Sequence, residues 1–205
     1  LFFRRKNTIL NNIRKALPQA SNKEITKIIY EMWNYYGKIF AEYSFMKYFR
    51  NNTQHIELEG LDILEDIKKK QEPVIFISGH FDNFELMAME IEKSGINLAA
   101  IYRPLNNIFM SQIMENIREK YICKKQIKKG RSSIRSLINY FKEGYSIALM
   151  IDQRVSEGIK SNFFGHNAYT TTIPAQFVKK FNCQVVPIFI ERKNEIKFKI
   201  KIYKP

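Results

Sequence analysis

The sequence predicts an α/β fold: a layered domain with a largely parallel central sheet flanked by helices, preceded by an N-terminal helical segment. From about residue 51, short apolar runs alternate with longer stretches of helical periodicity. The runs 73–78 (PVIFIS) and 145–152 (YSIALMID) are continuously apolar, which is typical of parallel strands buried on both faces. We therefore expect residues 1–50 to form the helical segment and residues 51–205 the α/β domain.

The N-terminal segment contains a helix start at Ser21, because Glu24 follows three positions later in a capping-box pattern. Apolar side chains then recur near helical spacing to about residue 49: Ile25, Ile28, Ile29, Met32, Trp33, Tyr36, Phe40 and Tyr43. We interpret this aromatic-rich face as core. The alternative is that part of it lies against a membrane.

Strands and helices alternate through the rest of the chain. Strands are predicted over 55–60, 73–78, 97–103, 145–152 and 184–192, and helices over 61–70, 85–95, 108–120, 134–144 and 174–182. Glycines at 95 and 144 close two of these helices, as glycine commonly does. The intervening stretch 152–174 (DQRVSEGIKSNFFGHNAYTTTIP) is too long for a simple connector, and we expect it to be functional.

The charge balance is strongly basic, with 34 Lys and Arg against 20 Asp and Glu, a net charge of +14. Such an excess predicts acidic partners: nucleic acid, an anionic membrane surface or an acidic protein. The densest basic cluster comprises Arg118, Lys120, Lys124, Lys125, Lys128, Lys129, Arg131 and Arg135. Glu119 is the one acidic residue in this stretch of the sequence. The cluster is either a solvated face or a docking site for an acidic partner.

The chain begins LFFRRK, without a methionine, and stops after the alternating stretch KFKIKIY. An apolar tip followed by Arg4, Arg5 and Lys6 is typical of the cytoplasmic edge of a membrane anchor; an ordinary frayed terminus is the alternative. We expect the α/β domain to be truncated at both ends. No run reaches the ~18 apolar residues of a transmembrane helix.

Metal and disulfide sites are not predicted. Cys123 and Cys183 stand 60 positions apart without a CxxC pairing, which is typical of reduced cytoplasmic thiols. His166 has no companion ligands at suitable spacing, so we interpret it as a loop residue.

The stretch 78–85 (SGHFDNFE) places His80 and Glu85 where a buried strand ends and a helix begins. Ligands of open α/β sheets bind at this carboxyl edge. A neutral imidazole there can take a proton from a hydroxyl group if a carboxylate holds its other ring nitrogen, and Glu85 is one turn away. This pair suits direct attack by a substrate hydroxyl on an activated acyl group. The alternative is a second capping box, with Asp82 at the N-cap and Glu85 at N3.

Two further polar groups follow predicted strands. Arg103, in IYRPLNN, follows a strand that we expect to neighbour the strand before His80, and its planar fork can bind phosphate or carboxylate. Asp152 and Gln153 end another apolar strand, and Asp152 can orient Arg103 or a bound ligand. A surface arginine at a strand end is the alternative for Arg103.

The long stretch after Gln153 offers candidates for substrate binding. Phe164 and Gly165 can line an apolar groove. Because glycine has no side chain, the wall of this groove can approach a ligand closely at Gly165. Thr171 is one of three hydroxyls before the last predicted helix, although helix capping accounts for one of them.

The motifs SGHFDNFE, YRPLNN, DQR…FFGHNAYTTTIPA and VVPIFIER occur in one order over nearly the whole chain, and in this the sequence resembles the bacterial lipid A biosynthesis acyltransferases of the glycerolipid acyltransferase-like superfamily. The resemblance implies that His80 is the general base and Glu85 its carboxylate partner. It implies that Arg103 and Asp152 match family positions near the active site, and that the residues around Phe164 and Gly165 match a second motif loop of the family.

The reaction implied by the resemblance is transfer of a fatty acyl chain from acyl carrier protein to a hydroxyl of a lipid A precursor. No metal or redox cofactor is implied. The expected partners are acyl carrier protein, a phosphorylated glycolipid and an anionic membrane surface, at the cytoplasmic face of the bacterial inner membrane. No nucleic acid partner is expected.

Two positions depart from the motif usual in that family, Gly-His-x-Gly-Asn-Trp-Glu: Asp82 replaces its second glycine and Phe84 its tryptophan. Asp tolerates a positive φ at modest cost, but a carboxylate near His80 is expected to favour the imidazolium, which cannot act as a base. The alternatives are a related acyltransferase with another glycolipid or phospholipid acceptor or an acyl-coenzyme A donor, a non-catalytic membrane protein, and a basic nucleic-acid-binding domain.

Overall fold

The structure is a computed structural model that describes residues 2–130, 132–155 and 158–205, with the side chains described from residue 7 onward. Within these residues seven strands form one sheet, in the order β1-β9-β8-β2-β5-β3-β4. Their bounds are β1 Ile56–Glu59, β2 Ile75–Ser78, β3 Leu98–Tyr102, β4 Lys125–Lys128, β5 Ser146–Met150, β8 Val185–Arg192 and β9 Phe198–Ile202. Neighbouring strands pair in parallel except β8 and β9, so the predicted largely parallel sheet is confirmed.

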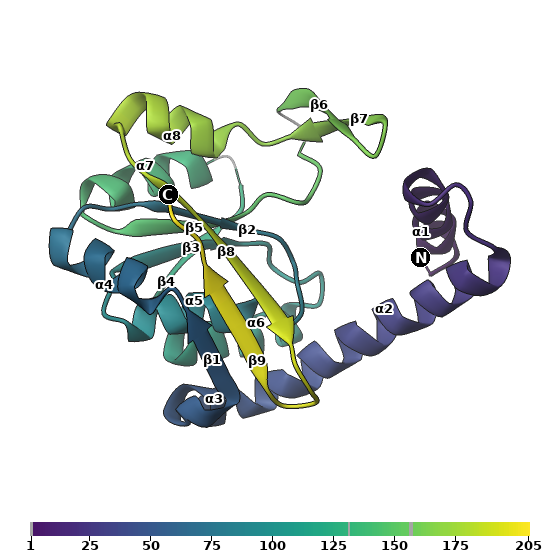
Figure 1. Ribbon diagram of the computed structural model, residues 1–205, viewed down its shortest axis with the longest axis horizontal. Helices are drawn as coiled ribbons and strands as arrows, with labels where there is room; N and C mark the ends of the chain where they lie inside the picture. The colour runs from purple at the N-terminus through teal and green to yellow at the C-terminus, as the bar shows by residue number, and fades with distance from the viewer. Residues whose placement is uncertain (1, 131, 156–157) are drawn as a thin grey trace.

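Helices cover both faces of this sheet (Figure 1). They are α4 Leu61–Lys70, α5 Glu85–Lys93, α6 Ile108–Tyr121, α7 Ser133–Lys142 and α8 Ile173–Phe181. Alternation along the strands explains the two layers: Phe76 of β2 packs in the cluster with α4, α5 and α6, whereas Ile75 packs with α7 and α8. A strand buried on both sides has to be apolar at every position, which is the pattern of its sequence.

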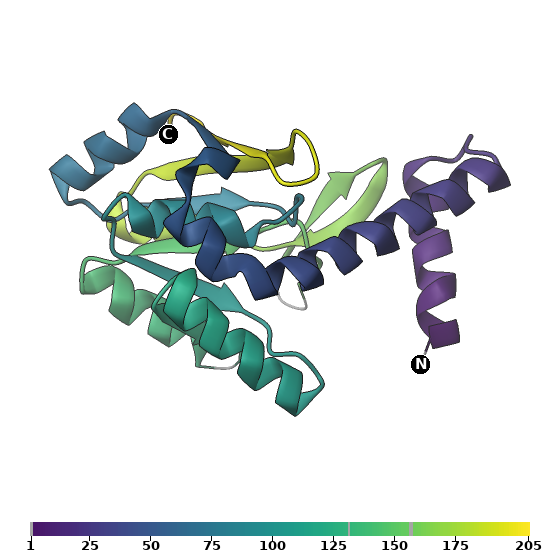
Figure 2. The same ribbon diagram turned by 90° about the horizontal axis from the view of Figure 1, so that it is seen from below.

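The N-terminal segment consists of α1 Phe2–Ala16, α2 Asn22–Glu42, the short 3-10 turns η1 Tyr43–Phe45 and η2 Thr53–His55, and α3 Met46–Asn51. The capping box at Ser21 and Glu24 is confirmed, with both reciprocal hydrogen bonds formed. Helix α2 projects from the α/β domain as an arm, and α1 crosses its far end (Figures 1 and 2).

The aromatic face of α2 is not core, contrary to the prediction. Ile25 and Tyr43 are buried, but Trp33, Tyr36 and Phe40 are each about half exposed. The reason is geometric: because α2 extends beyond the edge of the sheet, only its C-terminal end packs on the α/β domain. No helix in the described part of the chain is both long enough and apolar enough to cross a membrane. The side chains of Arg4, Arg5 and Lys6 lie outside the described ones.

The stretch 152–174 contains an antiparallel hairpin that periodicity did not predict, β6 Ile159–Phe163 and β7 His166–Thr170. Phe164 and Gly165 form its two-residue turn, with φ of +50° and +74°. Two positive φ values in succession match the turn type that fits the twist of a hairpin. Most of its residues are exposed, because the hairpin stands apart from the seven-stranded sheet (Figure 1).

One predicted neighbour relationship is wrong, and β4 and α1, like the hairpin, had no prediction of their own. Strand β3 lies beside β5 and β4, so β5 separates it from β2. Strand β4 is an edge strand of mainly polar residues, inside the basic cluster, and α1 lies in the stretch interpreted as an anchor edge or frayed end. Neither shows the apolar run from which a strand or a core helix is predicted.

Candidate functional site

His80 and Asp152 meet at the carboxyl edge of the sheet. In the parallel pairing of β2 with β5, Ser78 lies opposite Met150, so two further residues along each chain bring His80 beside Asp152. His80 Nδ1 lies 2.8 Å from Asp152 Oδ1, and the backbone N–H of His80 donates to Asp152 Oδ2 at 2.9 Å. The carboxylate therefore holds both the ring and the backbone of His80, and leaves Nε2 for a ligand.

The His80 side chain is partly accessible to solvent. The His80 side chain is 31% exposed and that of Asp152 is 40% exposed. The ring of Phe84 packs edge-on against the imidazole, with the centroids 4.8 Å apart, and Gln153 Nε2 lies 3.4 Å from His80 Nε2. Because Phe84 and Asp152 fix the ring on two sides, Nε2 has a set direction.

Gly79 lies between the Phe81 ring and Asp152. A Cβ at this position would stand 2.9 Å from the ring of Phe81 and 3.4 Å from Cβ of Asp152. A larger residue would therefore require the Phe81 ring to shift, whereas its contact with Asp152 would be ordinary van der Waals packing. The loop then turns through Asp82 at a φ of +39°, a conformation that Asp tolerates at modest cost, and enters α5 at Glu85.

Glu85 does not hold the ring of His80 in this structure, which corrects the predicted pairing. Its Oε1 accepts hydrogen bonds from Nε of Arg118 at 2.9 Å, from Nη2 of Arg118 at 2.5 Å and from the hydroxyl of Tyr43. Glu85 is buried in the first turn of α5. The carboxylate of Glu85 therefore pairs with Arg118 of α6. The contact with His80 Nδ1 that was expected of Glu85 is made by Asp152.

The pKa values of Tyr43 and Arg118, the two partners of Glu85, are both raised. Burial raises the pKa of Tyr43, and the neighbouring charge of Glu85 raises it further, so the phenol stays protonated and donates to Glu85. Burial alone would lower the pKa of Arg118, but the charges and hydrogen bonds of Glu85 and Tyr43 together outweigh this effect and raise it. The cluster joins η1, α5 and α6 through charge-assisted hydrogen bonds.

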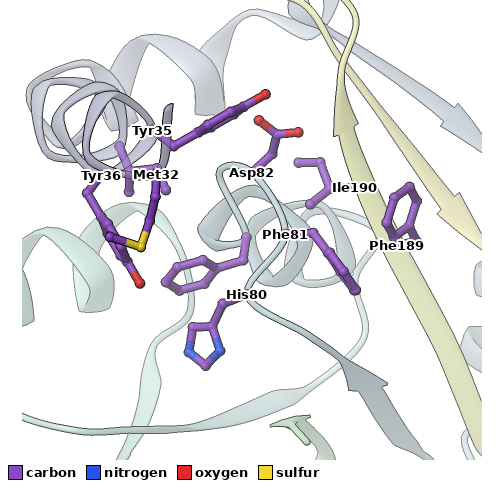
Figure 3. Close-up of a pocket in the computed structure, with 10 residues that line it drawn as sticks. Met32, Tyr35, Tyr36, His80, Phe81, Asp82, Phe189 and Ile190 are labelled. Atoms are coloured by element: carbon purple, nitrogen blue, oxygen red, sulfur yellow. The ribbon is translucent and has the colours of Figure 1, made fainter. Parts of the chain in front are cut away.

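Asp82 points away from His80. In Figure 3 the two side chains lie on opposite sides of their loop, with Asp82 directed towards α2. Asp82 Oδ2 accepts from the backbone N–H of Arg192 at 2.9 Å, and its Oδ1 lies 3.3 Å from Nε of the same residue. Asp82 is thus paired with Arg192 and makes no contact with His80, whose carboxylate partner is Asp152.

Arg192 connects Asp82 to the arm helix. Its Nη1 donates to Glu42 Oε1 at 2.7 Å, and Asn83 Nδ2 donates to Glu42 Oε2 at 2.7 Å. The Arg192 side chain is only 6% exposed, and the charges of Glu42 and Asp82 raise its pKa despite the opposing effect of burial. These contacts fasten the C-terminal end of α2 to the His80 loop and to β8.

Two hollows meet at His80, and both are lined by His80 and Phe84. The first, of about 340 Å³, is mainly apolar and lies between α2, the His80 loop and β8 (Figure 3). Its other lining residues are Met32, Tyr35, Tyr36, Ile39, Phe81, Asp82, Phe189 and Ile190. Because α2 supplies one wall, the arm helix is part of the site.

The second hollow, also about 340 Å³, carries cationic and amide groups. Arg103, Arg118, Lys129, Gln126 and Gln153 line it together with apolar side chains of α5, β3 and β5. Arg103 and Lys129 are exposed at the open edge of the sheet, whereas Arg118 is hydrogen-bonded to Glu85. This hollow suits an anionic group beside His80.

The structure brings together some of the predicted site residues and separates others. Arg103, Asp152 and Gln153 lie with His80 at one edge, although the contacts of Asp152 are to His80 and not to Arg103. Phe164 and Gly165 line a different hollow, beside the C-terminal end of α1. Thr171 Oγ1 accepts a hydrogen bond from the backbone N–H of Ile173, the first residue of α8, while the N-cap residue Thr172 makes no side-chain cap hydrogen bond.

The basic cluster is not one uniform face. Arg118 points inward to Glu85, and Lys128 forms an ion pair with Glu115, while Arg131 lies outside the described residues. His166 is exposed at the start of β7. Over 7–130, 132–155 and 158–205, no three potential metal ligands gather in one place.

Sequence reasoning missed the roles of Asp152, Arg118, Tyr43 and Arg192. For Asp152 the sequence offered a signal, because this residue ends an apolar strand as Ser78 does. The sequence did not show that these two strands are neighbours in the sheet. For Arg118 the helical spacing from Tyr121 and Met114 placed it on the inner face of α6. Tyr43 and Arg192 gave no local signal, since their partners lie 42 and 110 positions away.

The fold and the site together define an α/β protein with a His–Asp pair at the open edge of its sheet, between an apolar hollow and a cationic one. The family model of the bacterial lipid A biosynthesis acyltransferases matches residues 1–205. The chain belongs to this family, as its motifs indicated.

Two curated relatives are similar over about two thirds of the chain. The lipid A biosynthesis myristoyltransferase of Escherichia coli (strain K12) is 25% identical over 140 residues, which are 65% of this chain and 42% of that protein. Lipid A biosynthesis acyltransferase 1 of Shigella flexneri is 26% identical over 137 residues, 64% of this chain and 41% of that protein. The match thus spans about two fifths of the length of either relative.

Proposed function

We propose that this protein is an acyltransferase that moves a fatty acyl chain from acyl carrier protein to a hydroxyl of a lipid A precursor. The observation that carries the proposal is the His80–Asp152 pair, in which Nδ1 is held at 2.8 Å and Nε2 faces two hollows of different chemistry. Family membership supplies the reaction class.

In this mechanism the acceptor hydroxyl gives its proton to His80 Nε2, and its oxygen attacks the thioester carbonyl. The tetrahedral intermediate collapses with cleavage of the carbon–sulfur bond, and the departing thiolate takes the proton back from the imidazolium. Asp152 keeps the proton of the neutral ring on Nδ1 and stabilises the imidazolium as it forms. His80 is the catalytic residue, and Asp152 is a positioning residue.

Glu85 has a positioning role in this proposal, in place of the predicted direct contact with His80. Its ion pair with Arg118 fixes the first turn of α5, which follows the His80 loop. The N-terminal end of α5 and the cations of the second hollow are suited to the negative charge that develops on the carbonyl oxygen.

The two hollows suit two different groups of the substrates, the hydrocarbon chain and a phosphate. The apolar hollow between α2 and β8 suits the hydrocarbon chain, because aromatic and aliphatic side chains dominate its lining. The hollow with Arg103 and Lys129 suits a phosphate, either of the acceptor glycolipid or of the carrier's prosthetic group. The net charge of +14 favours both acidic partners and an anionic membrane surface at the cytoplasmic face of the inner membrane.

The test is mass spectrometry of lipid A from a bacterium that lacks its own late acyltransferase and expresses the gene that encodes this chain. One added acyl mass is expected with the wild-type protein. The variants His80→Ala and Asp152→Asn run beside it, and His80→Ala should remove the added mass at equal protein level.

Two results would contradict the proposal in different ways. An added mass that persists in His80→Ala would exclude His80 as the base. No added mass with well-expressed wild-type protein would exclude lipid A as the acceptor in that host; total-lipid mass spectrometry of the same cells then tests other glycolipids and phospholipids. Purified protein supplied with acyl carrier protein thioester or acyl-coenzyme A separates the two donors.

A further inference from the structure

Glu42, the last residue of α2, is hydrogen-bonded to two separate parts of the site. Its Oε1 accepts from Arg192 Nη1 at 2.7 Å, and its Oε2 accepts from Arg192 Nη2 at 3.2 Å and from Asn83 Nδ2 at 2.7 Å. The carboxylate therefore joins α2 to β8 through Arg192 and to the His80 loop through Asn83. Because the Glu42 side chain is only 14% exposed, these bonds lie largely out of water, where a hydrogen bond is electrostatically stronger.

The sheet and the turn beside it hold Arg192 in place. Its guanidinium lies over the ring of Phe198, with Cζ 4.4 Å from the ring centroid, and Phe198 is its partner in the β8–β9 pairing. Arg192 Nη1 donates to the backbone carbonyl of Glu195 at 2.7 Å, and Asp82 accepts from the backbone N–H and Nε of Arg192. The guanidinium is thus fixed independently of α2, and its planar fork admits the Glu42 carboxylate in one orientation.

Glu42 continues the face of α2 that lines the apolar hollow. Four side chains of α2 line that hollow: Met32, Tyr35, Tyr36 and Ile39. Glu42 follows three positions after Ile39, so it lies on the same face one turn later. Successive residues of a helix are about 100° apart around its axis. The rotation of α2 that brings Glu42 to Arg192 is therefore the rotation that turns the lining face towards the hollow.

Apolar packing by itself does not fix this rotation. Tyr35 and Tyr36 are 44% and 50% exposed, so their side chains are not locked between other residues. Ile39 packs against the core, but apolar contacts have no preferred direction. The bonds between Glu42 and Arg192 are directional. Since desolvation offsets much of the attraction within a buried ion pair, the main effect of this one is on geometry rather than on stability.

We propose that Glu42 and Arg192 are positioning residues that set the rotation of α2 and thereby determine which acyl chain the apolar hollow accepts. Figure 3 shows α2 and β8 on opposite sides of the hollow, with the His80 loop between them. The inference rests on the proposed function because it takes a hydrocarbon chain as the occupant of this hollow. A hollow with a fixed wall discriminates between chain lengths, whereas a wall that turns freely accepts several.

The first test is binding of decanoate, dodecanoate, tetradecanoate and hexadecanoate, measured by calorimetry below the concentrations at which they form micelles. The wild-type chain should bind its preferred length at least about tenfold more tightly than the least favoured one, and Glu42→Ala should reduce this ratio to less than about threefold. In Glu42→Ala, Arg192 still pairs with Asp82, so the His80 loop stays attached to β8 while α2 is released.

Two further variants separate positioning from loss of stability. Glu42→Gln should keep part of the preference, because its amide oxygen still accepts from Arg192, and its amide N–H can donate to Asn83 Oδ1, which has no partner among the described residues. Arg192→Lys keeps the positive charge but not the planar fork, and should lose the preference as Glu42→Ala does. Thermal melts identify the variants that are folded at the assay temperature. An undiminished preference in both Glu42→Ala and Arg192→Lys would overturn the proposal.

Glu31→Ala is the matched control. Glu31 is an exposed glutamate of the same helix, pairs with Lys27 and does not line the apolar hollow. Its replacement by alanine changes the helix propensity of α2 as Glu42→Ala does, and should leave the length preference unchanged. If Glu31→Ala reduces the preference equally, the effect belongs to α2 in general and the proposed role of Glu42 is wrong.

A second measurement follows α2 directly. Spin labels at Tyr30→Cys on α2 and Glu65→Cys on α4, in a Cys183→Ser background, report the distance between two exposed positions. Cys123 is buried and should stay unlabelled. The distance distribution should be narrow in the otherwise wild-type chain and with Glu31→Ala, and should broaden or shift with Glu42→Ala. An identical distribution with Glu42→Ala would show that Glu42 does not hold α2, and would overturn the proposal.

Positioning and acyl transfer can fail separately, because neither measurement requires a reaction. A length preference that depends on Glu42, in a protein that transfers no acyl chain, would refute the proposed function and leave the role of Glu42 and Arg192 standing. In an active protein, Glu42→Ala should raise KM for the preferred donor more than it lowers kcat, since His80 and Asp152 are untouched. Acyl transfer with a donor preference that Glu42→Ala leaves unchanged would refute the inference alone, as would a wild-type chain that binds none of the fatty acids.

Discussion

Asp82 and Arg192, 110 positions apart, form a bond between the His80 loop and strand β8 in which Asp82 accepts both the backbone N–H and a guanidinium N–H of Arg192. The residue that replaces the motif's second glycine therefore has a structural partner. Since Arg192 also binds Glu42, the same contact joins the loop to the arm helix that lines the apolar hollow. The position tolerates aspartate because Asp adopts its φ of +39° at modest cost.

Asp82→Asn should lower the free energy of unfolding by about 1–3 kcal/mol, because the largely buried Arg192 loses one of its two carboxylate partners. Asn tolerates the same positive φ, so the change isolates the charge. Asp66→Asn, which removes an exposed pair with Lys70, is the control and should cost less than about 0.5 kcal/mol. Urea titrations of the three proteins measure the difference. Equal losses would mean that the Asp82–Arg192 bond adds nothing to stability.

Asp152→Asn should lower kcat by about 10²–10⁴-fold, because an amide neither holds the ring as firmly nor stabilises the imidazolium. The side chain is 40% exposed, so stability should change little. Single-turnover acyl transfer and a thermal melt measure the two effects. A variant that keeps wild-type kcat would show that the contact at Nδ1 is dispensable.

Arg118→Leu should destabilise the fold by about 3–5 kcal/mol, because it leaves the Glu85 carboxylate buried without its cation. Glu85→Gln/Arg118→Leu should recover part of this loss, since the isolated charge is then removed as well. A double-mutant cycle by urea unfolding gives the coupling energy. Additive losses would show that the two residues act independently.

Met32→Trp should shift the preferred donor towards shorter acyl chains, because the larger side chain fills part of the apolar hollow of about 340 Å³. Tyr30→Trp, on the same helix but exposed and away from that lining, should leave the preference unchanged. Competition among acyl donors of different length measures both variants. An unchanged preference in Met32→Trp would place the acyl chain elsewhere.

The two thiols should differ in reactivity. Burial raises the pKa of Cys123 to about 12, so almost none of it is thiolate at pH 8, and the fully buried sulfur is also shielded from reagents. Cys183 is only partly buried, although burial raises its pKa too. A disulfide reagent at pH 8 should therefore react first with Cys183, and Cys123 should become reactive on denaturation. Rapid labelling of Cys123 in the native protein would contradict its burial.

Much of the fold followed from local sequence. The buried strands before His80 and Asp152 had continuous apolar runs, the helix after Ser21 had its capping box, and glycines marked helix ends. These features depend on residues within a few positions of one another, so a sequence pattern registers them. The polar edge strand β4 and the hairpin β6–β7 escaped prediction, because neither contains an apolar run; β4 contributes only Ile127 to the core.

By itself the sequence determined the α/β class, the family and the position of His80 at the carboxyl end of a buried strand. Only the tertiary structure decided which carboxylate holds that histidine. Glu85 is near in sequence, but α5 turns it into the interior, where burial is tolerable only beside Arg118 and Tyr43. Asp152 is 72 positions away, yet the pairing of β2 with β5 places it at Nδ1. Strand order and register are set by packing of the whole domain, and no local pattern encodes them.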